Sequence, residues 1–301
     1  MKKDKKMKLQ LKILSVVFVT GVIVLGFLGA SASGKKTSNA KDSKKTESVK
    51  AEAKKPAEDP RIEKLNLVLS KMTPRFRMEC KDIILADKET FLNELEAVLA
   101  DEDNYPSNED PSSKQFFLID KKHKSQPEMY VPADLVSLVK NNYYNISRND
   151  LSLRSYVQDA LVEMAKGARQ DGITLLVSST YRSWEYQKNL FQKWVRIDGL
   201  EEAERESARE GTSQHQLGFA IDFGSIDDSF IQTSQGKWLN SHCEDYGWSL
   251  SFPQGYEDVT GYRWECWHYR YIGIPACKLQ NKWFNDIQQF MLEFIDEWKK
   301  N

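Results

Sequence analysis

The sequence predicts an α+β domain that extends from about Phe116 to the C-terminus and follows a helical region. Apolar residues recur at three- and four-residue steps in several long segments, which is the period of an amphipathic helix. Short apolar or aromatic runs lie between these segments and indicate strands. The chain has 301 residues, of which 40% are apolar, so it can bury a sizeable core.

Helical periodicity is clearest over residues 152–170, where Gly172 follows as a stop signal. Pro132 stands near the first turn of another expected helix, which begins in "VPADLVSLVK". The remaining helices are expected over residues 61–100, in the segment "WEYQKNLFQKW" after a turn, and over residues 201–210, 237–246 and 283–298. No internal repeat accompanies them.

Strands are expected where apolar runs are short and bounded by polar residues or glycine. Four segments fit: "FFLID" at residues 116–120, "ITLLVSS" at 173–179, "GFAIDFG" at 218–224 and the aromatic, alternating "YRWECWHYRYIG" at 262–273. Since these strands alternate with helices, residues 116–301 are predicted to form one α+β domain, preceded by a helical region over residues 61–115.

The N-terminus has the pattern of an export signal. "MKKDKKMKLQLK" carries six lysines, 18 uncharged residues follow from Ile13 to Ala30, and "ASA" offers a small-residue cleavage site. Residues 1–32 are therefore predicted to be a signal peptide or a membrane anchor, and the rest of the chain is expected outside the cytoplasm. Residues 33–60 are rich in Lys and Ser and predict a disordered tether.

Net charge and cysteine content limit which function classes and covalent links fit the sequence. The net charge of -1 argues against a nucleic-acid-binding protein, which would need a strongly basic domain. The four cysteines are Cys80, Cys243, Cys266 and Cys277. They allow two disulfides in an exported protein, but free buried thiols fit equally well because no CxxC spacing is present.

Two short motifs contain side chains that can bind a metal. "TSQHQLGFAID" contains His215 and Asp222, and "ECWH" contains Glu265 and His268. Catalytic zinc takes three protein ligands from His and carboxylates, which His215, Asp222 and His268 supply, and Glu265 then suits a general base. Residues three apart on a strand face opposite sides, so a bulge or turn must bring Glu265 and His268 together. A surface His–Asp pair and a buried core histidine are the competing interpretations.

A third polar group lies in "SSTYRSWEYQ", where Arg182 stands beside Ser179, Tyr181 and Gln187. An arginine there suits a substrate carboxylate or a developing oxyanion, although an arginine in a turn is often only solvated. The sequence contains no HExxH motif, no nucleophile elbow and no phosphate-binding glycine loop.

Taken in order, these motifs resemble the VanY-type D-alanyl-D-alanine carboxypeptidases. "SxHxxGxAxD" at residues 213–222 and "ExWH" at 265–268 are joined by "YRSxxxQ" at 181–187, "VPADLV" at 131–136, "GKWL" at 236–239, "YGW" at 246–248 and "TGYRWE" at 260–265. The resemblance covers about residues 116–274. Its relatives usually carry proline where Cys266 stands, which bears on the turn that aims Glu265 and His268.

The resemblance implies a small central antiparallel sheet flanked by helices, with a zinc site in a cleft on the sheet. By that resemblance one zinc ion is bound by His215, Asp222 and His268, and Glu265 is the catalytic base. Arg182 contacts the substrate, with Gln187, Ser213 and Tyr181 nearby. The implied reaction removes the terminal D-alanine from peptidoglycan stem peptides outside the cytoplasmic membrane of a bacterium. An L,D-carboxypeptidase that trims tetrapeptides, or a non-catalytic wall-binding module, are the alternatives.

Overall fold

The computed structural model describes residues 59–301. The predicted signal peptide or anchor at residues 1–32, and nearly all of the predicted tether at 33–60, lie outside the described residues. Within residues 59–301, no helix combines the length and apolar character that crossing a membrane would need.

The predicted helical region consists of three helices, α2 (Pro60–Lys71), α3 (Pro74–Ala86) and α4 (Lys88–Glu102). Each begins at a residue whose side chain accepts a hydrogen bond from a backbone N–H of the first turn: Asp59, Thr73 and Asp87. Proline occupies the first turn of α2 and α3, where it costs no hydrogen bond. The helical prediction for residues 61–100 is therefore confirmed.

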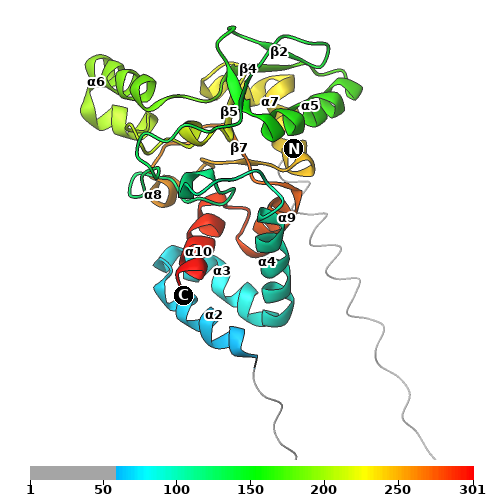
Figure 1. Cartoon of the computed structure of the whole chain (residues 1–301), viewed down its shortest axis with the longest axis vertical. Helices are drawn as coiled ribbons and strands as arrows, with labels where there is room; N and C mark the ends of the chain where they lie inside the picture. The colour runs from blue at the N-terminus through cyan, green and yellow to red at the C-terminus, as the bar shows by residue number, and fades with distance from the viewer. Residues whose placement is uncertain (1–58) are drawn as a thin grey trace, which may run out of the picture. The chain divides into compact units, whose positions relative to one another are not determined.

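Two C-terminal helices, α9 (Ile274–Trp283) and α10 (Gln288–Lys300), pack with α2, α3 and α4 around one apolar core (Figure 1). The prediction of one helix over residues 283–298 is wrong at its start. Asn285 and Asp286 have positive φ angles of 51° and 59°, so the backbone turns there and α10 begins only at Gln288. The helix α9 was not predicted.

The central sheet has five strands in the order β2-β4-β5-β7-β6. Their bounds are β2 (Tyr144–Ile146), β4 (Leu175–Ser179), β5 (Ala220–Phe223), β6 (Trp248–Leu250) and β7 (His268–Tyr271). The α+β class is confirmed, but the sheet is larger than expected and mixed, because β2 pairs with β4 in parallel while the other pairs are antiparallel.

Helices cover this sheet and complete a second apolar core. The helix α5 (Ser155–Gln170) packs Val157, Leu161 and Met164 into the same cluster as Leu175 and Val177 of β4. The remaining helical elements are α6 (Trp184–Glu206), interrupted at Gly199, α7 (Ser234–His242), α8 (Glu257–Thr260) and the short 3₁₀ turns η1 (Pro111–Ser113), η2 (Gln214–Leu217), η3 (Asp228–Gln232) and η4 (Cys243–Tyr246).

The predicted strand at residues 116–120 is wrong. The backbone N–H of Phe116 donates to the Glu102 carboxylate (2.8 Å), and the carbonyls of Gln115 and Phe117 accept from the buried Arg270 guanidinium (3.0 Å each). Side chains therefore satisfy these backbone groups, and no partner strand is needed.

The predicted helix in "VPADLVSLVK" is also wrong. Residues Leu135–Ser137 form β1, which pairs antiparallel with β3 (Ser152–Arg154), and the Arg154 guanidinium donates to the Asp134 carboxylate (2.8 Å). Because Ser152–Arg154 form β3, the helix predicted at 152–170 begins three residues later, at Ser155.

In the aromatic segment 262–273, which was predicted as one strand, only His268–Tyr271 is strand.

The four cysteines are all buried and free, so the structure has free thiols rather than the two disulfides that the sequence also allowed.

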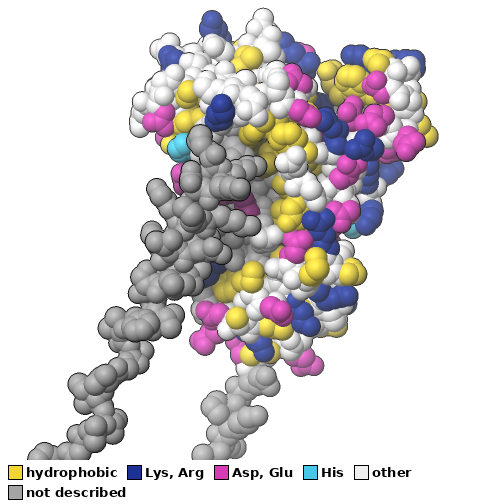
Figure 2. Space-filling model, turned by 180° about the vertical axis from the view of Figure 1, so that it is seen from behind, with side chains coloured by type: hydrophobic (Ala, Val, Ile, Leu, Met, Phe, Trp, Pro, Cys, Tyr) yellow, Lys and Arg dark blue, Asp and Glu magenta, His cyan; other side chains and the backbone are white. Residues whose placement is uncertain are grey.

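On the face shown in Figure 2, Lys and Arg side chains are interspersed with Asp and Glu side chains.

Candidate metal centre and its cavity

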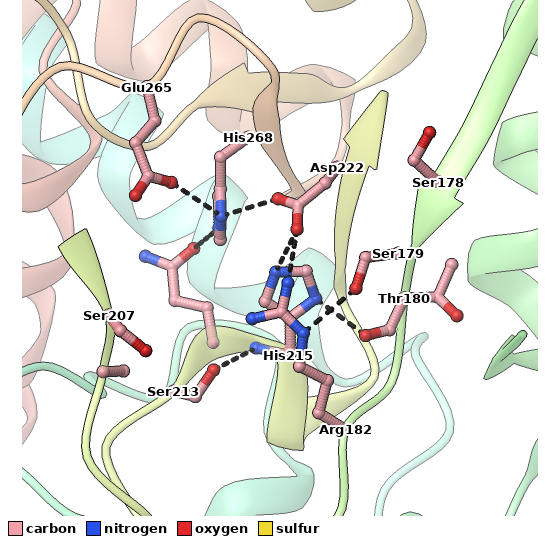
Figure 3. A network of polar contacts seen from close by, with 12 residues as sticks. Ser178, Ser179, Thr180, Arg182, Ser207, Ser213, His215, Asp222, Glu265 and His268 are labelled. Carbon is pink, nitrogen blue, oxygen red and sulfur yellow. Dashed lines mark hydrogen bonds and ion pairs between the residues drawn. The ribbon is translucent and has the colours of Figure 1, made fainter. Parts of the chain in front are cut away.

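Three potential ligands meet where η2, β5 and β7 come together (Figure 3). Donor atoms of His215, Asp222 and His268 all lie within 4.8 Å of one another, and all three residues are buried. Asp222 and His268 are register partners on neighbouring antiparallel strands. The antiparallel pairing therefore brings together two side chains that are 46 positions apart in the sequence.

His215 is carried into the site by the turn before β5. The Ser213 hydroxyl accepts from the backbone N–H of His215 (3.3 Å) and caps η2, and Gly218 ends η2 in the left-handed conformation with φ of 74°. A Cβ at Gly218 would lie 2.9 Å from the Arg154 side chain, so glycine is required both by the turn and by this close approach.

A turn at Cys266 and Trp267 brings Glu265 to the same place. The backbone N–H of His268 lies 3.4 Å from the Glu265 carbonyl, and the strand β7 begins only at His268. The Glu265 Oε2 atom consequently lies 3.4 Å from Nδ1 of His268. The turn that the three-residue spacing required is present, with Cys266 and Trp267 at its centre.

The hydrogen bonds of the two histidines leave lone pairs that face acceptors. Nδ1 of His215 lies 2.7 Å from the Thr180 carbonyl, which can only accept, so Nε2 carries a lone pair. This Nε2 atom lies 3.2 Å from Oδ2 of Asp222 and has no hydrogen-bond partner. Nε2 of His268 lies 3.2 Å from the Gln214 amide oxygen, so Nε2 carries the proton and Nδ1 carries the lone pair. This Nδ1 atom lies 3.1 Å from Oδ1 of Asp222, and that Oδ1 atom has no hydrogen-bond partner.

Acceptor atoms buried against one another are stabilised by a proton or a metal cation between them, so these three side chains fit a metal ion. Burial and the nearby Arg182 charge lower the pKa of His215 to about 4, which keeps this imidazole neutral and able to bind a metal. Burial alone would raise the pKa of Asp222, but His215 and Arg182 hold it well below its usual value. Asp222 is therefore ionised.

The electrostatic field around His268 favours positive charge. Burial would lower its pKa, but the Asp222 and Glu265 carboxylates outweigh burial and raise it to about 9. A metal ion at this position satisfies the same carboxylates. Burial raises the pKa of Glu265 from its ordinary value, which moves this carboxyl toward the range of a general base or acid.

Arg182 is fixed at the wall of the site. Its guanidinium donates to Oδ2 of Asp222 and, through Nε, to the Ser179 hydroxyl (3.0 Å). Gln187 is fully buried behind it, with Oε1 3.5 Å from Nη1 of Arg182 and Nε2 donating to the Ala208 carbonyl (2.6 Å). Gln187 thus supports the arginine. Tyr181 is half-buried and does not line the cavity that opens from this site.

A cavity of about 640 Å³ opens from the metal ligands. One end is formed by His215, Asp222, His268, Glu265, Arg182 and Ser213, and the walls include Phe252, Tyr262, Trp267 and Gln289. The lining also includes Arg148, Asp228 and Arg263, and Tyr186, Leu190 and Trp194 of α6. This volume is in the range of small-ligand sites.

Comparison with known proteins gives a consistent assignment. The family model for VanY, D-alanyl-D-alanine carboxypeptidase, matches residues 150–274. The solved structure of the LdcB LD-carboxypeptidase is 30% identical, superposes with a TM-score of 0.54, and is matched over 87% of its own chain and 62% of this one. The chain belongs to the VanY family of carboxypeptidases.

Two further relatives are similar to this chain over comparable lengths. YodJ of Bacillus subtilis (strain 168) is 31% identical over 185 residues, which are 60% of this chain and 66% of YodJ. The D-alanyl-D-alanine carboxypeptidase of Enterococcus faecium is 26% identical over 220 residues, 71% of this chain and 67% of that enzyme. The chain therefore spans about two thirds of the length of these two relatives. Carboxypeptidases are hydrolases, so the family assignment makes this chain a member of a hydrolase family.

All eight residues predicted from the sequence lie inside the VanY match at 150–274. Six of them line the cavity, Gln187 contacts Arg182 from behind, and Tyr181 does not line the cavity. Sequence reasoning missed Gln214, which contacts His268, and the cavity walls on α6 and α10. Gln289 of α10 lies beyond the family match, and no motif marks it as part of a site.

Proposed function

We propose that this protein is an exported zinc carboxypeptidase that removes the terminal D-alanine from peptidoglycan stem peptides. The proposal rests on the buried acceptor atoms of His215, Asp222 and His268, which face one another. These three residues line the cavity together with Glu265 and Arg182. Two imidazoles and one carboxylate are a ligand set typical of catalytic zinc.

His215, Asp222 and His268 would hold the zinc ion, which would supply a Lewis acid for the scissile carbonyl and the attacking water. Glu265 takes a proton from the attacking water and later gives it to the leaving amine, a role that its raised pKa suits. Its position 3.4 Å from His268 places it beside the metal ligands. Arg182 presents a guanidinium to the terminal carboxylate of the substrate, which a carboxypeptidase must recognise.

The substrate assignment follows the family. The Enterococcus faecium relative is a D-alanyl-D-alanine carboxypeptidase, which favours a D,D-specific reaction on pentapeptides. The similarity to LdcB favours a second candidate, an L,D-carboxypeptidase that shortens tetrapeptides to tripeptides. Both are hydrolyses of a C-terminal D-alanine, and they differ in the chirality of the residue before the cleaved bond.

Incubation of the purified protein with pentapeptide and tetrapeptide stems distinguishes the two candidates. We expect loss of one alanine from the pentapeptide, read as product mass, together with about one zinc per chain. Loss of alanine from the tetrapeptide alone would establish the L,D reaction. A zinc-free protein that cleaves either peptide would overturn the mechanism, and a zinc-bound protein that binds stems without cleaving would indicate a wall-binding module.

The location proposed for this reaction is outside the cytoplasmic membrane, where the substrate lies. It rests on the Lys-rich start and apolar run of residues 1–32. Fractionation of the native host, with detection of the protein in the membrane, wall and culture medium, tests export. Its presence in the cytoplasm alone would contradict the proposal.

A further inference from the structure

A buried amide lies directly behind the metal-binding face of His268. The Gln214 side chain is 6% exposed, and its Oε1 atom lies 3.2 Å from Nε2 of His268. The same oxygen accepts from the Ser251 hydroxyl (2.8 Å). An amide presents either an acceptor or a donor to its neighbour, and the two choices have opposite effects on the imidazole. The oxygen keeps the proton on Nε2 and leaves the Nδ1 lone pair for a metal.

A second buried amide determines which way Gln214 points. Nε2 of Gln214 donates to Oε1 of Gln288 (3.3 Å), and Nε2 of Gln288 donates to the backbone carbonyl of Ser249 (3.3 Å). A backbone carbonyl can only accept, so it fixes the Gln288 amide, and the Gln288 oxygen then fixes the Gln214 amide. The polarity set at Ser249 is thereby transmitted, bond by bond, to the imidazole of His268.

This relay connects the catalytic sheet to the helical core. Gln288 is the first residue of α10 and is 1% exposed. The helix α10 packs in the core shared by α2, α3, α4 and α9, and it lies beyond residues 150–274, which the VanY family model matches. Gln288, which lies outside the matched segment, is therefore connected to His268 through a single side chain, Gln214.

We propose that Gln288 and Gln214 are positioning residues that hold His268 in the tautomer able to bind zinc. The proposal rests on the zinc site of the proposed function. Hydrogen bonds to the outer nitrogen of a ligand histidine typically change metal affinity by about 10–100-fold. Loss of the Gln288 side chain leaves the Gln214 amide free to rotate and present its NH₂ group to His268, which disfavours the required tautomer.

The test measures zinc affinity by competition with a chromophoric chelator, on the full chain as it is produced. We expect Gln288→Met and Gln214→Met each to weaken zinc binding by about 10–100-fold. Gln214→Glu should bind zinc more tightly than Gln214→Met, because either carboxylate oxygen accepts from Nε2–H of His268. In the Gln214→Glu background, Gln288→Met should not weaken zinc binding further, because a carboxylate has no wrong orientation.

Gln280→Met is the matched control. Gln280 on α9 is also 1% exposed. Its side chain accepts from the Ser249 hydroxyl (2.9 Å) and donates to the Asp286 carboxylate (2.8 Å). Neither of these bonds involves Gln214 or His268. It should lower the melting temperature of the metal-free protein as much as Gln288→Met does, with zinc affinity unchanged.

The outcomes separate the relay from the site itself. If Gln280→Met weakens zinc binding as much as Gln288→Met, or if Gln288→Met acts equally in both backgrounds, the relay is refuted and only general packing matters. If a Gln288→Met protein does not fold, Gln214→Met against Gln214→Glu decides the same question. If the wild-type protein does not bind zinc, the proposed function fails instead.

Discussion

Asp222 and His268 are direct cross-strand partners on β5 and β7, and their Oδ1 and Nδ1 atoms lie 3.1 Å apart. The register of one antiparallel strand pair therefore sets the spacing of two potential metal ligands. A slip of one residue would turn one of the two side chains to the opposite face of the sheet. The adjoining pair Ile221 and Tyr269 is almost completely buried, which favours this register over its neighbours.

Asp222→Asn should abolish tight zinc binding, because it removes the charge that faces both imidazoles while keeping the size of the side chain. The wild-type protein should lose stability when a chelator removes zinc, by about 2.7 kcal/mol where free zinc is 100 times its dissociation constant. Thermal unfolding with and without chelator, with zinc content by elemental analysis, measures both. His242→Asn is the control, since His242 stacks on Trp238 away from the site. A chelator-sensitive Asp222→Asn protein would contradict this ligand set.

Glu265→Gln should retain about one zinc per chain and lose about 10²–10⁴-fold in kcat, because the amide cannot take a proton from water. The measurement is kcat on a pentapeptide stem, together with zinc content. Glu206→Gln is a suitable control, because Glu206 also lines the cavity but pairs with Arg263 at 3.6 Å. Near-normal kcat in the Glu265→Gln protein would place the base elsewhere.

The metal site was more predictable from the sequence than the architecture around it. His215, Asp222, Glu265 and His268 stand in short motifs that leave a surface pair or a core histidine open by themselves, but whose order resembles the VanY family. Strand geometry requires a turn between Glu265 and His268 if both face one site. The false strand at residues 116–120 has a different cause. Its apolar run is typical of a strand, but Arg270, about 150 positions away, binds its carbonyls, and no local pattern announces such a contact.

The helix predicted in "VPADLVSLVK" failed for a similar reason. Its spacing of apolar residues fits either period over so short a segment, and pairing of Leu135–Ser137 with β3 decides the outcome. Gln214 and Gln288 lie outside sequence reasoning altogether. A glutamine carries no signal of chemistry until the fold buries it beside a histidine, as it does here with His268.

Stability should fall between pH 4.5 and about 7 through Glu244. Burial, followed by a hydrogen bond with Asp286, raises the pKa of Glu244 from 4.5 to about 7. The folded protein therefore favours the protonated carboxyl, so this contribution is complete below pH 4.5 and is lost as pH rises through 7. Glu244→Gln should raise the melting temperature at pH 8 more than at pH 5, whereas Glu201→Gln, at an exposed residue of α6, should not. An equal shift at both pH values would contradict the assignment.

Residues 61–115 should unfold together with the catalytic domain, because α2, α3 and α4 share one core with α9 and α10. Phe91 is completely buried, and its ring centroid lies 5.4 Å from those of Trp283 and Phe294. Phe91→Ala should cost about 3–5 kcal/mol, measured by denaturant unfolding, in a single transition that zinc shifts. Leu67→Ala, at a residue 46% exposed on α2, should cost much less. Two separate transitions would support the predicted boundary at 115 and 116 as one between independent folding units.

Arg182→Gln should impair cleavage of peptides with a free C-terminal carboxylate more than it impairs cleavage of the same peptides as C-terminal amides. A hydrogen bond to a charged group contributes about 1.5–3 kcal/mol, so kcat/KM for the acid should fall by about 10–100-fold more than for the amide. The ratio matters because Arg182 also donates to Asp222, and any change in zinc binding lowers both values equally. Arg148→Gln, at a second arginine that lines the cavity but pairs with Asp150 (2.9 Å), should leave the ratio unchanged. An equal fall for acid and amide would show that Arg182 acts on catalysis only through Asp222.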